Sequence, residues 1–199
     1  MQLEANKRLA IFGKTRKGKT YWLKKHIFEA AKHIPVIICD MKLADFSKVP
    51  IIKDLTKFDW NVKTGVYRFR CFCEDDLRKF NKIAWEKLVS SKTRRAILVY
   101  DEISVYIENN SLKKFPYMKK LTVLGAAFGI GIWYATQRPA MLDKTLLSEC
   151  KYVVSFQMDS ERDRLAIANY FDPDDIMNLK KYWYYAYNDE TGVSKHAPI

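Results

Sequence analysis

The chain has 199 residues, 48% of them hydrophobic, and this composition indicates a globular protein with a sizeable core and excludes a disordered chain. The net charge of +12 favours a polyanionic partner, most often nucleic acid, over a surface that is lysine-rich only for solubility. Four cysteines are too few for a disulfide framework, so we expect a reducing setting. We expect no signal peptide, because the first residues, MQLEANKR, are polar.

Strand-length apolar runs alternate with helical patterns along the chain. We expect strands at residues 8–12, 36–40, 66–72, 96–102, 129–137 and 152–157, and helices at 20–34 and 74–91. Residues 181–189 and 192–199 are typical of a closing C-terminal β-hairpin. This order predicts an α/β fold, with a mostly parallel central sheet flanked by helices. Since no linker or repeat is evident, we expect residues 1–199 to form a single domain.

Two apolar stretches have competing interpretations. The alternation along residues 66–72 is typical of a half-exposed strand. Cys71 and Cys73 form a C-x-C there, and this alternation favours a strand with both thiols packed inside over a metal site. The longest uncharged run, residues 121–137, is short for a membrane-spanning helix. We expect it to contain a helix end, a glycine turn and a buried strand, and we predict no transmembrane segment.

Residues 13–20, GKTRKGKT, match the Walker A pattern G-x-x-x-x-G-K-[ST]. In this pattern a strand leads into a glycine loop whose N–H groups wrap a phosphate, and a helix begins facing the same phosphate. Lys19 would reach the β and γ phosphates, and the Thr20 hydroxyl would bind Mg²⁺. The alternative is a charged surface turn that matches by accident. We therefore predict an ATP and Mg²⁺ site that uses the whole loop: Gly13, Lys14, Thr15, Arg16, Lys17, Gly18, Lys19 and Thr20.

The loop cations Lys14, Arg16 and Lys17 occupy the free positions of the pattern. They would add phosphate affinity, contact a neighbouring subunit or face water, and the sequence leaves these three alternatives open.

The strand AILVYDE, residues 96–102, ends in two acids. Asp101 would bind the metal ion, and Glu102 would polarise a water for in-line attack on the γ phosphate. The alternative is a pair of acids at an ordinary strand end. Adjacent Asp and Glu, paired with the glycine loop, favour ATP hydrolysis.

The segment YATQRP, residues 134–139, places Gln137 where a strand ends. Its neutral amide would contact the γ phosphate or the attacking water. The alternative is a polar residue that only terminates the strand.

The order of these three elements resembles the HerA/FtsK superfamily of P-loop ATPases. Two further segments are similar, VIICDMK after the first helix and SECKYVVSFQMDSERDRL after the glutamine strand. Within that superfamily, the short chain looks like the genome-packaging ATPases of membrane-containing viruses, of the turreted icosahedral archaeal virus type. The resemblance implies a RecA-like (ASCE) P-loop fold.

The resemblance also implies a homo-oligomeric ring, often a hexamer, that threads double-stranded DNA into a preformed capsid. A capsid vertex or a membrane protein would be a further partner. The protein would then be found in the cytoplasm of an infected host cell and in the virion, and it would not be secreted.

In such rings a neighbouring subunit supplies an arginine finger to the ATP site. Relatives often carry this arginine in the turn before the glutamine strand, where this chain has Ala126 and Ala127. The candidates here are Arg138, Arg162 and Arg164, with Arg94 and Arg95 as more distant ones. For each, the alternative is a solvated surface arginine.

The segment SLKKFPYMKKL places four lysines around aromatic residues: Lys113, Lys114, Lys119 and Lys120. Cations beside an exposed aromatic suit contacts with a nucleic-acid backbone, so we hypothesise that this segment faces the channel of the ring. The alternative is a solvated helix start with Phe115 in the core.

Two other functions compete with a DNA motor. A nucleotide or small-molecule kinase also uses a phosphate loop, but we see no compact arginine-rich lid, and Glu102 favours water as the acceptor. The second competitor is a non-motor DNA-binding ATP switch or assembly factor.

Overall fold

The computed structural model describes residues 6–90 and 94–198. Within these residues, one sheet holds eight strands in the order β3-β2-β4-β5-β1-β6-β7-β8. The strands are β1 (Arg8–Phe12), β2 (Val36–Asp40), β3 (Val66–Arg70), β4 (Ala96–Asp101), β5 (Ile130–Thr136), β6 (Tyr152–Phe156), β7 (Tyr184–Asn188) and β8 (Gly192–His196). The pairs among β1 to β6 are parallel, whereas β6–β7 and β7–β8 are antiparallel. The mostly parallel sheet and the closing hairpin are confirmed.

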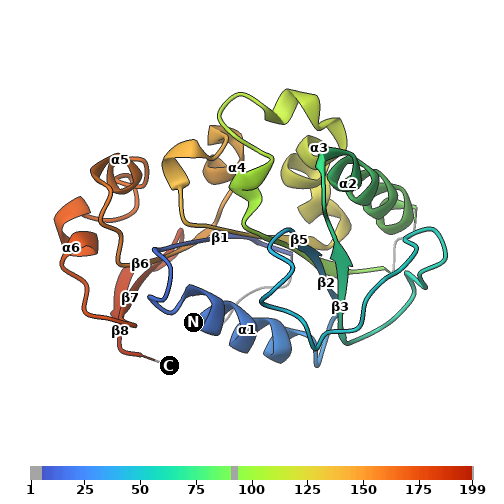
Figure 1. Ribbon diagram of the computed structural model, residues 1–199, viewed down its shortest axis with the longest axis horizontal. Helices are drawn as coiled ribbons and strands as arrows, with labels where there is room; N and C mark the ends of the chain where they lie inside the picture. The colour runs from blue at the N-terminus through green and yellow to red at the C-terminus, as the bar shows by residue number, and fades with distance from the viewer. Residues whose placement is uncertain (1–5, 91–93, 199) are drawn as a thin grey trace.

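Helices cover both faces of the sheet (Figure 1). The helix α1 (Lys19–Ala30) lies on one face, and α2 (Glu74–Val89), α3 (Pro116–Leu124) and α4 (Lys144–Ser148) lie on the other. Two short helices, α5 (Glu161–Leu165) and α6 (Pro173–Met177), lie near the hairpin end of the sheet. None of the helices within the described ranges is long and apolar enough to span a membrane.

The alternation of side chains along β1 separates two cores. Leu9 and Ile11 pack in the cluster that contains the buried face of α1, whereas Ala10 and Phe12 pack in the cluster of α2 and α3. All five residues of β1 are buried, because the strand lies between β5 and β6 under helices on both faces. The central strands therefore read as nearly continuous apolar runs.

Two expectations about the edge of the sheet are wrong. β3 does not alternate as a half-exposed strand, because Arg68 is buried and its Nη1 lies 3.0 Å from Oδ2 of Asp40. Cys73 is exposed at the start of α2, so only Cys71 packs inside. Among the described residues, no group of three or more His, Cys, Asp or Glu side chains is arranged to hold a metal ion.

The carboxyl ends of the parallel strands meet along one edge of the sheet. Asp40 pairs in register with Asp101, and Phe12 pairs with Thr136. Ligand sites of parallel α/β sheets lie at this edge, so residues that follow β1, β2, β4 and β5 are brought together there.

Candidate active site

The glycine loop, residues 13–18, connects β1 to α1 and lies against Phe156 of β6. Gly13 and Gly18 have φ values of 149° and 116°, in the region that favours glycine. A Cβ on Gly13 would lie 2.7 Å from Cβ of Phe156, and one on Gly18 would lie 2.9 Å from Cε1 of the same ring. The amide of Lys14 donates to the carbonyl of Gln157 at 3.1 Å. The two glycines therefore allow the loop to rest on β6.

Lys19 is buried at the first position of α1 and reaches across to the end of β4. Its Nζ donates to Oε2 of Glu102 at 3.2 Å. Burial lowers the pKa of Lys19, and the attraction of Glu102 only partly offsets this effect. Glu102 therefore does not fully offset the cost of burying the Lys19 ammonium, and this site suits an incoming polyanion.

Glu102 follows β4 with a left-handed backbone, φ 65°, and its carboxylate is held from several sides. Oε1 accepts from the amide of Gln137 at 2.8 Å and from the hydroxyl of Thr136 at 3.1 Å. Oε2 also accepts from Nε2 of Gln137 at 3.3 Å. Burial alone would raise the pKa of Glu102, but Lys19, the Gln137 amide and Lys42 outweigh it and lower that pKa to about 2. The carboxylate is thus ionised and fixed in place.

Lys42, which follows β2, is a second cation on the same carboxylate. Its Nζ lies 3.1 Å from Oε2 of Glu102, 3.6 Å from Oδ2 of Asp45 and 4.0 Å from Oδ1 of Asp101. Burial opposes the ammonium charge, but Asp101 and Glu102 raise the pKa of Lys42 overall. Lys42 ends the segment VIICDMK, and the sequence alone predicts no role for it in the site. Its position just after β2, beside Asp101 on β4, was the signal that could have found it.

Asp101 and Thr20, the two predicted Mg²⁺ ligands, are placed differently. Oδ2 of Asp101 is buried without a hydrogen-bond partner among the described residues, and burial raises the pKa of this carboxyl to about 6 despite Lys42 and Lys19. An unpaired buried oxygen at the end of β4 fits a metal ligand. The hydroxyl of Thr20 donates to Oδ2 of Asp45 at 3.5 Å. Asp45 was missed, because it lies in a segment with no periodic pattern.

Gln137 joins the end of β5 to the glycine loop. Its Oε1 accepts from the hydroxyl of Thr15 at 2.5 Å, while its Nε2 donates to Glu102. One amide therefore connects the loop that is expected to bind phosphate with the expected base.

The free-position cations of the loop differ from one another. Lys14 forms an ion pair with Asp159, which follows β6 and was not singled out by the sequence. Arg16 has a φ of 63° and lines a pocket, whereas Lys17 is partly buried.

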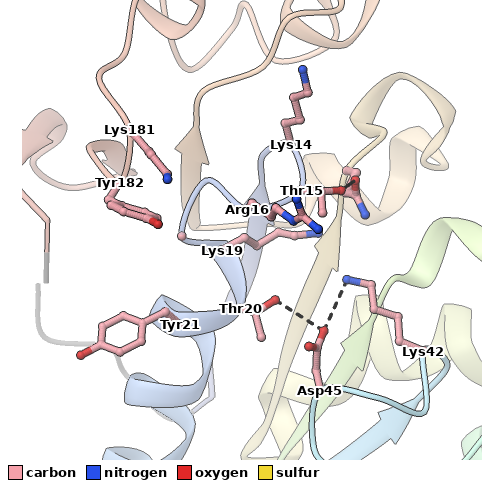
Figure 2. A pocket seen from close by; sticks show the side chains of 12 residues that line it. Lys14, Thr15, Arg16, Lys19, Thr20, Tyr21, Lys42, Asp45, Lys181 and Tyr182 are labelled. Carbon is pink, nitrogen blue, oxygen red and sulfur yellow. Dashed lines mark hydrogen bonds and ion pairs between the residues drawn. The ribbon is translucent and has the colours of Figure 1, made fainter.

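That pocket lies beside the loop and has a volume of about 470 Å³ (Figure 2). Besides loop residues and Gln137, its lining includes side chains that the sequence did not single out: Tyr21, Lys42, Asp45, Lys181 and Tyr182. Its size and its cations are suited to a nucleoside polyphosphate.

The arginine-finger candidates are separated by their environments. Arg164 is buried and donates to the carbonyls of Met158 and Asp159, so its placement does not favour a contact with a neighbouring subunit. Arg138 is 58% exposed in its side chain, and its Nε lies 3.3 Å from Oδ2 of Asp163. Arg162 is exposed on α5.

The two more distant candidates lie just before β4, at the opposite end of that strand from Glu102. Arg94 donates to Oδ1 of Asn61 at 2.8 Å and to the carbonyl of Lys87 at 2.6 Å. Arg95 is exposed.

The four lysines that were expected to contact DNA are exposed around the start of α3: Lys113, Lys114, Lys119 and Lys120. Phe115 is only 1% exposed, so the exposed aromatic of the channel hypothesis is wrong for this residue. Tyr117 is half-buried, and Nζ of Lys120 lies 5.3 Å from the centre of its ring.

Comparisons with known proteins give one sequence relative and several similar structures. No protein-family model matches the chain. The DNA translocase FtsK of Caldanaerobacter subterraneus subsp. tengcongensis is 23% identical over an alignment of 175 residues, and the match covers 76% of this chain and 24% of that protein. This chain therefore matches only about a quarter of the length of that relative.

Among solved structures, the genome packaging NTPase B204 of Sulfolobus turreted icosahedral virus 2, in complex with ATP-gammaS, has a TM-score of 0.83 at 20% identity, covering 99% of this chain and 100% of that one. The plasmid coupling protein TrwB, in complex with ADP and Mg²⁺, has a TM-score of 0.70 at 10% identity, covering 96% and 85%. The chain therefore has the fold of P-loop ATPases of the FtsK/HerA type, and the resemblance that its motifs indicated is confirmed in the fold.

Proposed function

We propose that this protein is an ATP-hydrolysing motor that translocates double-stranded DNA. The observation that carries the proposal is the position of Glu102, an ionised carboxylate that Gln137 fixes beside Lys19 at the end of the glycine loop. The FtsK relative is a DNA translocase, and B204 is a genome packaging NTPase that binds ATP-gammaS. These names support ATP as the nucleotide and DNA as the polymer. We further propose that residues 1–199 act as a single ATPase domain.

In the proposed reaction, Lys19 exchanges partners when ATP binds. The triphosphate gives the buried ammonium a stronger anion than the single carboxylate, so Lys19 turns toward the β and γ phosphates. Glu102 then loses one of its cations and becomes more basic. It orients a water molecule for in-line attack on the γ phosphorus and accepts the proton, while the bond to the β–γ bridging oxygen breaks and ADP leaves.

Gln137 keeps Glu102 and Thr15 linked during these steps, since its amide bonds to both. Thr20 and Asp101 would hold Mg²⁺, which neutralises charge on the phosphates when it is bound. The unpaired oxygen of Asp101 supports this assignment.

A ring of identical subunits, with a hexamer as the expected form, completes the proposal. A neighbouring subunit would supply Arg138 or Arg162 as the finger, because both side chains reach the surface. The four lysines around the start of α3 would contact the DNA backbone. The likeness to B204 supports packaging of a viral genome into a preformed capsid, inside an infected cell.

The deciding experiment measures free phosphate with and without double-stranded DNA, and searches for any phosphorylated acceptor. The motor predicts DNA-stimulated phosphate release and no acceptor, whereas a kinase predicts a phosphorylated product. Glu102→Gln should lose turnover and retain ATP binding. The exposed Glu86→Gln is the matched control and should keep both. Turnover in Glu102→Gln equal to that of the unmodified protein would refute the assignment of Glu102.

A further inference from the structure

The pocket beside the glycine loop has two different ends (Figure 2). Lys42 and Asp45 lie at one end, beside Lys19 and Thr20. Lys181 and Tyr182 lie across the loop from them, in the segment that connects α6 to β7. The hydrolysis steps described above use the first end only, so the second end has no role in them.

The ring of Tyr182 is held against the start of α1 by an uncommon backbone conformation. Tyr182 has a φ of 69°, a value that bulky side chains rarely adopt. The amide of Trp183 donates to the carbonyl of Lys180 at 3.0 Å and closes the turn. As a result, Cδ1 of Tyr182 lies 3.4 Å from the point where a Cβ on Gly18 would sit.

This ring is available to a ligand. Tyr182 is 45% exposed, and none of the aromatic ring pairs found among the described residues includes it. Its neighbour is a cation, since Nζ of Lys181 lies 4.8 Å from the centre of the ring. A strained turn that presents an uncovered ring to a polar pocket costs stability, and such strain is concentrated at ligand sites.

The two ends of a nucleoside triphosphate match the two ends of the pocket. Its anionic phosphate chain suits the end with Lys19 and Thr20, and its planar base suits the end with the ring of Tyr182. If Lys19 and Thr20 take the phosphates, the base extends away from Lys42 and Asp45, toward the second end. We propose that the base of the nucleotide stacks on Tyr182, with Lys181 beside it. This inference rests on the proposed function, because it takes the phosphate end of the site as given.

The test measures binding by calorimetry for two ligands, ATP and inorganic tripolyphosphate, in the presence of Mg²⁺. Tyr182→Ala should weaken ATP binding by about ten-fold, the size expected for one base stacked on one ring. It should leave tripolyphosphate binding unchanged. Tyr182→Phe keeps the ring and should bind ATP as the unmodified protein does. Phe72→Ala removes an aromatic that is 62% exposed elsewhere on the surface and should change neither ligand.

Three outcomes would overturn the inference: unchanged ATP binding in Tyr182→Ala, an equal loss for both ligands, or the same loss in Tyr182→Phe as in Tyr182→Ala. Tyr182→Leu keeps apolar bulk without an aromatic face, so it provides the comparison if the alanine variant does not fold. The proposed function fails separately. A protein that binds ATP through Tyr182 but releases no phosphate would refute the motor and leave the base site standing.

Discussion

Nζ of Lys19 lies 3.2 Å from Oε2 of Glu102, so the lysine expected to hold the γ phosphate and the carboxylate expected to activate water are paired with each other. Both side chains are nearly buried, at 5% and 11% exposure. The pair keeps two charges together at the end of the glycine loop until a stronger anion reaches the lysine. Because this pair forms in the nucleotide-free protein, the protonation of the Glu102 carboxyl can be measured without nucleotide.

Glu102 should make the stability of the nucleotide-free protein depend on acid. Its folded pKa of about 2 lies below the ordinary value of 4.5, so its contribution is complete above about pH 4.5 and is lost as the pH falls toward 2. At neutral pH the contribution is on the order of 3 kcal/mol at most. Urea unfolding of the unmodified protein and of Glu102→Gln should differ more at pH 7 than at pH 3. An equal difference at both values would contradict the shift.

Lys42 should contribute to the low pKa of Glu102, because its ammonium lies 3.1 Å from the same oxygen that Lys19 contacts. Lys42→Ala removes one of the two cations, and we expect the pKa of the Glu102 carboxyl to rise by roughly one unit in an NMR titration. Lys48→Ala removes an exposed cation from the same segment and should leave that pKa unchanged. If Lys42→Ala also leaves it unchanged, Lys19 and Gln137 hold the carboxylate without Lys42.

Gly13→Ala should damage the protein more than an alanine at another glycine with positive φ. At Gly13 the new Cβ would lie 2.7 Å from Cβ of Phe156, whereas at Gly192, with a φ of 75°, it would meet nothing within 4 Å. Gly192→Ala adds backbone strain of about 1 to 2 kcal/mol without a close contact, because its φ lies near the left-handed helical region. We expect Gly13→Ala to lower the free energy of unfolding by more than this value and to weaken ATP binding. Equal effects of the two substitutions would mean that the loop moves away from β6 without difficulty.

The lysines around the start of α3 should determine the salt dependence of DNA binding. Replacing Lys113, Lys114, Lys119 and Lys120 with Gln should lower the slope of log affinity against log salt by up to about 3.6, if each lysine neutralises one phosphate. The control replaces four other exposed lysines: Lys25, Lys32, Lys53 and Lys57. Equal losses in the two variants would show a general charge effect rather than a DNA-facing surface.

The parts of the site that sequence predicts are those set by strand ends. Gly13, Asp101, Glu102 and Gln137 each follow or end a buried apolar run, and parallel strands bring such positions to one edge of the sheet. Buried apolar runs also predict the positions of the eight strands, with bounds that differ from the observed ones by only a few residues. β4 ends at Asp101, one residue before the predicted boundary, because Glu102 turns into a left-handed conformation.

The parts that sequence did not predict depend on tertiary contacts. Asp45 lies in the long connection between β2 and β3, which has neither helical nor strand periodicity. Tyr182 lines the pocket because its own φ is positive, and the sequence gives no sign that a tyrosine will adopt this conformation. Arg68 was expected on a half-exposed edge, but an ion pair with Asp40 and a bridge from Ile51 cover it. Partners that are distant in the chain decide each of these cases.

The position of β1 in the sheet has a consequence for the order in which the protein becomes functional during synthesis. β1 is made before the other seven strands of the sheet but pairs with β5 and β6, and the glycine loop rests on Phe156 of β6. A growing chain therefore carries the glycine loop without the support that shapes it until β6 has been made. Tyr182 emerges later still. A ligand of the glycine loop would stabilise only a chain that already includes β6, so folding up to β6 must proceed without help from that ligand.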